Sequence, residues 1–214
     1  ISMGMGIWSM HFIGMMAFTL PIPLAYDVTT TALSFFIAVI ASGYALSVAH
    51  QPRISRGRLV ESAAVLGLGI TSMHYVGMYA ITVHPGLTYH PGIFAGSVAI
   101  AMVASYASLL LFFHLRTLSG ASRHLMRMLA AAIMGFAIAG MHYTGMAATG
   151  FAATAWCSGG IRFEQEWLAV LIAVIALGLL GITALLLLVD THLAARARRH
   201  SEELEVVNRR LQHA

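Results

Sequence analysis

The sequence predicts an all-α membrane protein: a polytopic bundle of six transmembrane helices with internal helix-pair repeats, followed by a cytoplasmic coiled-coil-like helix. Three observations lead to this prediction. Hydrophobic residues make up 59% of the chain and charged residues only 9%, whereas a soluble domain carries about 25% charged residues. Six apolar stretches follow one another along the chain, and a short phrase that contains histidine recurs three times.

The six apolar stretches are the expected helices. The complete ones approach or exceed the ~20 residues that a helix needs to span a bilayer. The first stretch begins at Ile1, already inside an apolar run. We therefore expect an N-terminally truncated bundle, with a further helix before Ile1 and seven helices in the intact protein. The stretches lie at residues 1–20, 31–49, 61–83, 92–115, 126–150 and 167–189.

The segments between these stretches alternate in charge. Of the 12 basic residues, all arginine, eleven lie in alternate segments and only Arg162 lies in the others. Because arginine-rich loops stay on the cytoplasmic side of a membrane, we predict a multi-pass membrane protein with a cytoplasmic C-terminus. The arginine-rich segments are residues 50–60, 115–127 and 191–214, and the arginine-poor segments are 20–30, 84–91 and 151–166.

An internal repeat runs through the chain. His11 and His74 are 63 residues apart, as are Tyr26 and Tyr89, and His142 follows His74 by 68 residues. The repeated unit is interpreted as a pair of helices, one rich in small residues and one that carries the histidine phrase. Small residues let transmembrane helices approach closely, and a glycine precedes each of these histidines by seven residues. These glycines are Gly4, Gly67 and Gly135.

The recurring phrase is Met-His-aromatic-x-Gly-Met. An ionisable residue within a membrane is costly and indicates a functional site. Residues i and i+4 share a helix face, so each copy presents an imidazole with a thioether, and the glycine leaves space for a neighbouring helix or an ion. Thioethers favour Cu(I) and imidazole suits several transition metals, which predicts a copper site. The candidate ligands are His11, Met15, His74, Met78, His142 and Met146, with Met10, Met73 and Met141 as secondary candidates.

Other interpretations of the histidines stay open. Paired histidines, or a histidine and a methionine, could be axial ligands of haem in an electron-transfer subunit, although haem leaves the third pair unexplained. A metal transporter would need ligands through the whole membrane, whereas the inner halves of the helices are rich in Leu, Ala and Val. The histidines could also be structural, in a metal-free scaffold. No catalytic triad or phosphate loop is present, so we expect neither an enzyme in this chain nor a nucleic-acid partner.

The tail differs in kind from the rest of the chain. We divide the sequence into a membrane domain, residues 1–190, and a cytoplasmic linker, residues 191–214. Five apolar residues and one histidine in the linker alternate at four- and three-residue spacing, which is typical of a short coiled coil. Such a seam allows a parallel homodimer and leads toward an output domain beyond Ala214. The seam residues are Leu193, Ala197, His200, Leu204, Val207 and Leu211.

The three phrases resemble the motif of the MHYT domain, a bacterial integral-membrane sensor domain. The third copy, Met141–Thr144, reads Met-His-Tyr-Thr in full, while the second reads Met-His-Tyr-Val and the first Met-His-Phe-Ile. The resemblance covers roughly residues 1–190. It implies six or seven transmembrane helices and copper bound by the motif residues near the outer face. It also implies sensing of a diatomic gas or of redox state, and a cytoplasmic output domain such as a cyclic-di-GMP synthase or phosphodiesterase.

Overall fold

The computed structural model divides into two compact units, residues 1–172 and residues 173–214. Side chains are described for fewer residues than the backbone, chiefly near residues 122–130, 157–165 and after 201. The described residues are 2–18, 24–49, 51, 54–115, 122–152, 154, 156–157 and 162–212.

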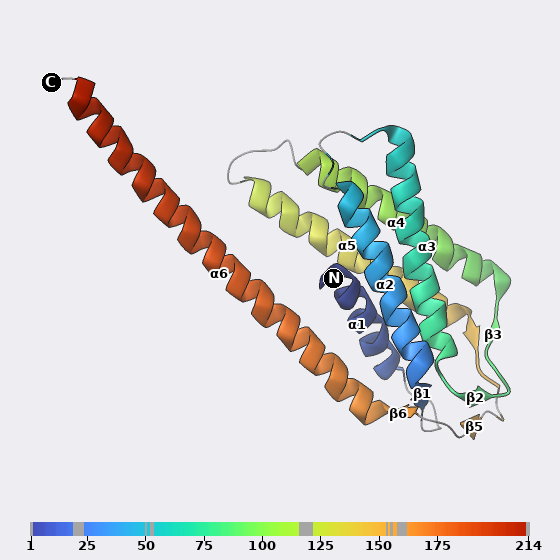
Figure 1. Ribbon diagram of the computed structural model, residues 1–214. Coiled ribbons are helices and arrows are strands. Elements are labelled where there is room, and N and C mark those ends of the chain that lie inside the picture. The colour runs from blue at the N-terminus through green and yellow to red at the C-terminus, as the bar shows by residue number, and fades with distance from the viewer. Residues whose placement is uncertain are drawn as a thin grey trace. The chain divides into compact units, whose positions relative to one another are not determined.

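Six helices account for most of the described chain and confirm the predicted all-α class (Figure 1). All of them except the first, which has 15 residues, contain stretches long and apolar enough to cross a membrane. The chain is therefore a multi-pass membrane protein. The helices are α1 (Ser2–Met16), α2 (Val28–Ala49), α3 (Arg56–Tyr79), α4 (Pro91–Leu115), α5 (Ser122–Ala148) and α6 (Gln165–Gln212).

Local sequence signals start several of these helices. The Ser55 side chain accepts a hydrogen bond from the backbone N–H of Arg58 at 3.3 Å and caps α3. Asp27 caps α2, since its Oδ1 accepts bonds from the backbone N–H of Thr30 at 2.7 Å and from the Thr30 hydroxyl at 2.6 Å. Such side chains satisfy first-turn donors that have no partner within the helix. Pro91 opens α4, where its missing N–H costs nothing.

The motif helices converge inside the first unit. α2 packs against α1 and α3, α4 packs against α3 and α5, and α1, α3 and α5 contact one another. Glycine permits two of these approaches: a Cβ at Gly4 would lie 2.7 Å from the Ala38 carbonyl oxygen on α2, and one at Gly67 would lie 3.2 Å from the Ala101 carbonyl oxygen on α4. At Gly135 a Cβ would meet nothing within 4 Å among the described residues, so no such approach is seen there in the described part of the chain.

The sequence indicated only connecting loops at the motif end of the bundle. In the structure, these segments contain short β-strands. They form three antiparallel strand pairs, and an isolated bridge joins Tyr26 to Ile81. These pairings link the three segments to one another at the end where the motifs lie (Figure 1). The pairs are β1 (Ala25–Asp27) with β6 (Arg162–Glu164), β2 (Val83–His84) with β5 (Trp156–Cys157), and β3 (Thr88–Tyr89) with β4 (Thr149–Gly150).

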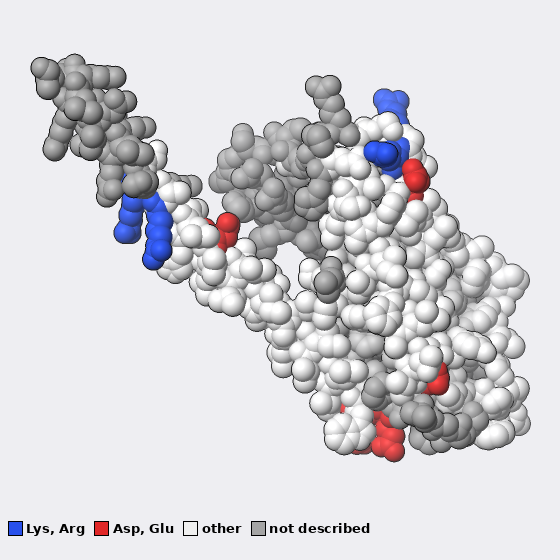
Figure 2. Space-filling model, viewed as in Figure 1, with Lys and Arg blue, Asp and Glu red and all other residues white. Residues whose placement is uncertain are grey.

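Charge separates the two ends of this unit. Its described basic side chains lie at the end where α3 begins, away from the strands, whereas acidic side chains occur at both ends (Figure 2). Arg53 and Arg116, on which the charge argument also rested, lie outside the described residues. The orientation of the bundle across the membrane therefore stays a prediction.

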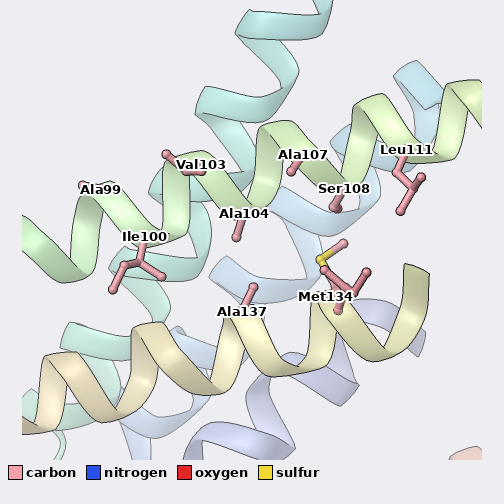
Figure 3. Close-up of a pocket in the computed structure, with 10 residues that line it drawn as sticks. Ala99, Ile100, Val103, Ala104, Ala107, Ser108, Leu111, Met134 and Ala137 are labelled. Carbon is pink, nitrogen blue, oxygen red and sulfur yellow. The ribbon is translucent and has the colours of Figure 1, made fainter. Parts of the chain in front are cut away.

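An apolar groove of about 480 Å³ runs between α4 and α5. In Figure 3, Ala104 and Ala107 of α4 lie opposite Met134 and Ala137 of α5. The lining contains no His, Cys, Asp or Glu, and its only polar side chain is Ser108. This lining suits contact with hydrocarbon and offers little to a polar ligand or a metal, so the groove is not the candidate site.

Helix α6 runs without a break past the predicted domain boundary at residue 190. Leu168 and Ile172, near its start, are buried in the first unit. Within the second unit, nearly every described side chain is exposed. The side chains of four seam residues lie outside the described set, so the coiled coil and the boundary at residue 190 stay predictions; these are His200, Leu204, Val207 and Leu211.

Candidate metal centre

The three motif histidines meet inside the bundle. Each lies toward the C-terminal end of its helix, on α1, α3 and α5. The Nδ1 atom of His11 lies 3.1 Å from that of His74 and 3.2 Å from that of His142, and the last two atoms are 3.3 Å apart. All three residues have 0% exposure. The shared depth predicted for the three histidines is therefore confirmed.

The imidazole rings stand nearly perpendicular to one another. Their centroids are 4.9 to 5.1 Å apart, with interplanar angles of 81 to 88°. In this arrangement the Nδ1 atoms face the centre of the cluster. The Nε2 atoms are also buried, and none has a hydrogen-bond partner among the described residues.

The three Nδ1 atoms cannot all be satisfied by bonding to each other. In a neutral imidazole, each ring nitrogen is either a donor or an acceptor. Among three mutually close nitrogens, at most two contacts can pair a donor with an acceptor. The third contact then joins two lone pairs or two protons. A cation at the centre would accept all three lone pairs, and imidazole is a ligand for copper, zinc, iron and nickel.

The cluster contains histidine only. Of the described His, Cys, Asp and Glu residues, it is the one group of three or more whose ligand atoms could hold a metal ion together. His84, in contrast, lies on β2 with its ring 5.4 Å from that of Trp156. The donor set thus fits a metal without supplying any negative charge.

The glycine of each phrase lies against one of these rings. A Cβ at Gly14 would collide with Nε2 of His142, and the corresponding collisions pair Gly77 with His11 and Gly145 with His74. The sequence predicted that this glycine leaves space for a neighbouring helix or for an ion. The first alternative, a neighbouring helix, is confirmed. What fills the space is the imidazole of another motif helix.

The motif methionines are mostly buried, but their part in the site stays a prediction. Met15 and Met78 have 0% exposure and Met146 has 8%. Of the secondary candidates, Met73 and Met141 are also buried, and Met10 is partly buried. Their placement on the motif helices is as predicted, whereas ligation by their sulfur atoms has no direct support.

Tyr26 is a part of the site region that the sequence interpretation missed. It has 0% exposure, and its ring lies 5.7 Å from that of Phe12, which in turn lies 4.7 Å from the His11 ring. Its backbone belongs to β1, so the strand layer places an aromatic side chain against Phe12, beside the cluster. The one feature of the sequence that singled out Tyr26 was its 63-residue spacing from Tyr89. That spacing indicated the internal repeat but did not predict a position near the histidines.

Two hydrogen bonds fix motif helices to the helices that follow them. The Trp8 indole N–H on α1 donates to the Ser34 hydroxyl on α2 at 3.0 Å. The hydroxyls of Tyr75 on α3 and Ser97 on α4 lie 2.7 Å apart. Ser34 and Ser97 are themselves 63 residues apart, so the repeat places the same polar anchor in both helix pairs.

A bundle of apolar helices around a buried histidine cluster defines a polytopic membrane protein with a candidate metal centre. The chain belongs to the MHYT family, described as a bacterial signalling protein N-terminal repeat, whose model matches residues 4–61, 67–125 and 135–199. Each matched repeat begins in a motif helix and continues into the next helix. The recognised resemblance is thereby confirmed, and the chain is a membrane signalling domain.

Curated relatives are signalling proteins too. The chain is 44% identical over 212 residues to the bifunctional diguanylate cyclase/cyclic di-GMP phosphodiesterase MucR of Pseudomonas aeruginosa, covering 98% of this chain and 31% of MucR. It is 41% identical over 135 residues to the cyclic di-GMP phosphodiesterase NbdA of the same organism, covering 63% of this chain and 17% of NbdA. It is 40% identical over 113 residues to the signaling protein YkoW of Bacillus subtilis, covering 53% and 14%.

These matches limit what the chain itself does. It spans less than a third of the length of each of these relatives. The part that it spans is the MHYT sensor domain and not the part that performs the chemistry named for MucR and NbdA. No solved structure matches the chain.

Proposed function

We propose that this chain is the metal-binding sensor module of a bacterial inner-membrane signalling protein, with copper held by His11, His74 and His142. The observation that carries the proposal is the triangle of Nδ1 atoms, 3.1 to 3.3 Å on each side. The point equidistant from the three atoms is about 1.9 Å from each, close to the ~2.0 Å of common metal–imidazole bonds.

The absence of acidic ligands favours Cu(I) over divalent ions. Three neutral imidazoles leave the whole charge of the ion in a buried site, and no carboxylate or thiolate joins the cluster among the described residues. The cost of moving an ion out of water into a low-dielectric interior rises with the square of its charge. A divalent ion would therefore pay about four times the cost of a monovalent one. Structural zinc also favours four ligands.

The same geometry argues against the alternatives. A bis-histidine haem would need a porphyrin between the two ligating nitrogens, and here the third imidazole occupies that space. A transporter would need further ligands along the helices, and among the described residues His, Cys, Asp and Glu gather in this cluster alone. Both arguments support a fixed, buried metal.

A sensor must pass a change at this cluster to an output domain. We propose that a diatomic ligand or a redox change alters the packing of α1, α3 and α5. The change then passes through α6, which is continuous from Gln165 to Gln212. A cytoplasmic C-terminus and a parallel homodimer of the α6 tails would deliver it to an output domain that acts on cyclic di-GMP, as the names of MucR and NbdA suggest.

Copper analysis tests the proposal. The full chain, purified without a histidine tag under reducing conditions, is expected to hold one copper per chain by elemental analysis. His74→Ala should remove it, whereas His84→Ala should not, because His84 lies on β2 outside the cluster. Copper that is absent from the parent chain, or unchanged in His74→Ala, would contradict the proposal.

A further inference from the structure

Each motif glycine contacts the histidine of a different motif helix, and the contacts close a cycle. Gly77 on α3 faces His11 on α1, Gly145 on α5 faces His74 on α3, and Gly14 on α1 faces His142 on α5. In every case the nearest atom to an added Cβ is Nε2, followed by the neighbouring ring carbon Cδ2. The glycine backbone therefore supports the Nε2 edge of each ring.

This contact decides which ring nitrogen is free to bind an ion. Nε2 lies against a helix backbone on the outside of the cluster, and Nδ1 faces the centre. Metal-bound histidines usually donate their other N–H to an acceptor that fixes the ring and its tautomer. Here Nε2 has no such partner among the described residues. Contact with a glycine backbone therefore restricts the orientation of each ring, which is one of the tasks of that hydrogen bond in other metal sites.

The Nδ1 triangle also restricts additional ligands. Its centre is equidistant from the three nitrogens and lies in their plane, so the three imidazoles complete a trigonal set by themselves. A methionine sulfur from the same phrases could approach only from above or below that plane. This geometry favours the three imidazoles over the His–Met pairs as the primary ligand set, and ligation by the methionines stays a prediction.

We propose that Gly14, Gly77 and Gly145 are positioning residues that create a three-coordinate site bound through Nδ1 of His11, His74 and His142, without methionine in the coordination plane. This inference rests on the proposed copper function and specifies its ligand atoms. The six-residue phrase then has two parts with different tasks. Histidine supplies the ligand, and the glycine of the neighbouring helix orients it.

X-ray absorption on the copper-loaded full chain tests the ligand set without any substitution. The expected first shell contains three nitrogen scatterers and no sulfur at bonding distance. A sulfur in the first shell would overturn the inference while leaving the copper function intact. A chain that binds no copper would instead overturn the proposed function, and this inference with it.

Glycine variants test the positioning role. Gly77→Ala is expected to weaken Cu(I) affinity at least about tenfold, within the range for residues that orient metal ligands, as measured by competition with a chromogenic Cu(I) chelator. Gly140→Ala on α5 is the matched control, because a Cβ there meets nothing within 4 Å among the described residues. Met78→Leu, which keeps the volume of the side chain, should retain copper within about threefold.

Unchanged copper affinity in Gly77→Ala would overturn the positioning role. Because alanine is the better helix former, a loss of affinity cannot come from helix propensity. If Gly77→Ala does not fold, the absorption spectrum of the parent chain and the affinity of Met78→Leu still decide the case. Loss of copper in Met78→Leu would contradict the three-imidazole ligand set.

Discussion

The helix pairs α1–α2 and α3–α4 share the histidine cluster with α5, the third motif helix, but differ from it in the surroundings of the glycine that precedes each histidine by seven residues. Gly4 and Gly67 lie against the backbone of a following helix, whereas Gly135 has open space around it among the described residues. The aromatic residue after each histidine also differs: Phe12 has 0% exposure and Tyr143 has 58%. The three histidines nevertheless have the same 0% exposure.

This difference indicates that the mutual contacts among α1, α3 and α5 determine the positions of the three histidines. If the close helix contacts at Gly4 and Gly67 positioned the histidines, the lack of such a contact at Gly135 among the described residues would leave His142 more exposed than the other two. Instead, each histidine ring is held by a glycine from another motif helix. The flanking helices therefore contribute stability, and the motif helices themselves define the site.

The largest expected effect comes from the histidines. If the three repeats contribute equally to the site, His11→Ala, His74→Ala and His142→Ala should each weaken Cu(I) affinity by about 100-fold or more, since losing a ligand costs at least as much as losing a residue that orients one. Chelator competition on the three variants measures this. A tenfold spread among them would show that the repeats contribute unequally.

The glycines seven residues before the histidines should separate the helix pairs from α5. Gly4→Ala is expected to destabilise the fold by about 1–3 kcal/mol, as overpacking does, because its Cβ would meet α2 backbone that cannot move aside. Gly67→Ala should cost less, since its nearest neighbour is the flexible Met102 side chain. Gly135→Ala should be neutral or stabilise by up to about 1 kcal/mol.

Reversible unfolding in mixed detergent micelles measures these three changes in free energy. A loss in Gly135→Ala equal to that in Gly4→Ala would break the comparison. It would mean that another helix packs against Gly135 in the membrane.

The serine anchors sharpen the comparison between the first two pairs. Ser34→Ala leaves the indole N–H of Trp8 unpaired at 2% exposure, with an expected cost of about 1–3 kcal/mol. Ser97→Ala removes the partner of the partly buried Tyr75 hydroxyl and should cost about 0.6 kcal/mol, the average for hydrogen bonds between membrane helices. The same unfolding assay applies, and the reverse order would contradict this assignment.

The smallest effect concerns the residues that precede α2 and α4. Asp27 caps α2, while the equivalent position before α4 is His90, whose carbonyl oxygen accepts from Phe94 N–H. The pKa of the Asp27 carboxyl is lowered, first by the Thr30 side-chain hydrogen bond and then by backbone N–H groups. Its contribution is therefore fully present above the ordinary pKa of about 3.9 and is lost as pH falls through the lower folded-state pKa.

Asp27→Asn keeps a capping side chain and removes the charge. It should cost about 0.3–1 kcal/mol near neutral pH, the usual contribution of an anion at a helix N-terminus. The difference from the parent chain should disappear once the pH is below the folded-state pKa. Thermal unfolding along an acid series checks this, and a difference that persists in strong acid would exclude a charge effect.

Much of the fold could be predicted because its signals are local. Apolar length predicted the helices, the 63- and 68-residue spacings predicted the repeats, and the recurring phrase identified His11, His74 and His142. Helix periodicity also placed a methionine beside each histidine, but whether its sulfur binds metal depends on the rotation of three helices about their axes. The spacing of residues along the sequence does not predict how each helix is rotated about its axis.

The sequence by itself determined an apolar helical bundle with three equivalent histidines, because hydrophobic length and residue identity act within one helix at a time. Tertiary structure alone decided that the Nδ1 atoms converge, that each Nε2 atom faces a glycine on another helix, and that Tyr26 packs against Phe12 beside the cluster. It also decided that the short segments at the motif end pair as strands. These features arise from contacts between segments distant in the chain, and packing, not periodicity, sets them.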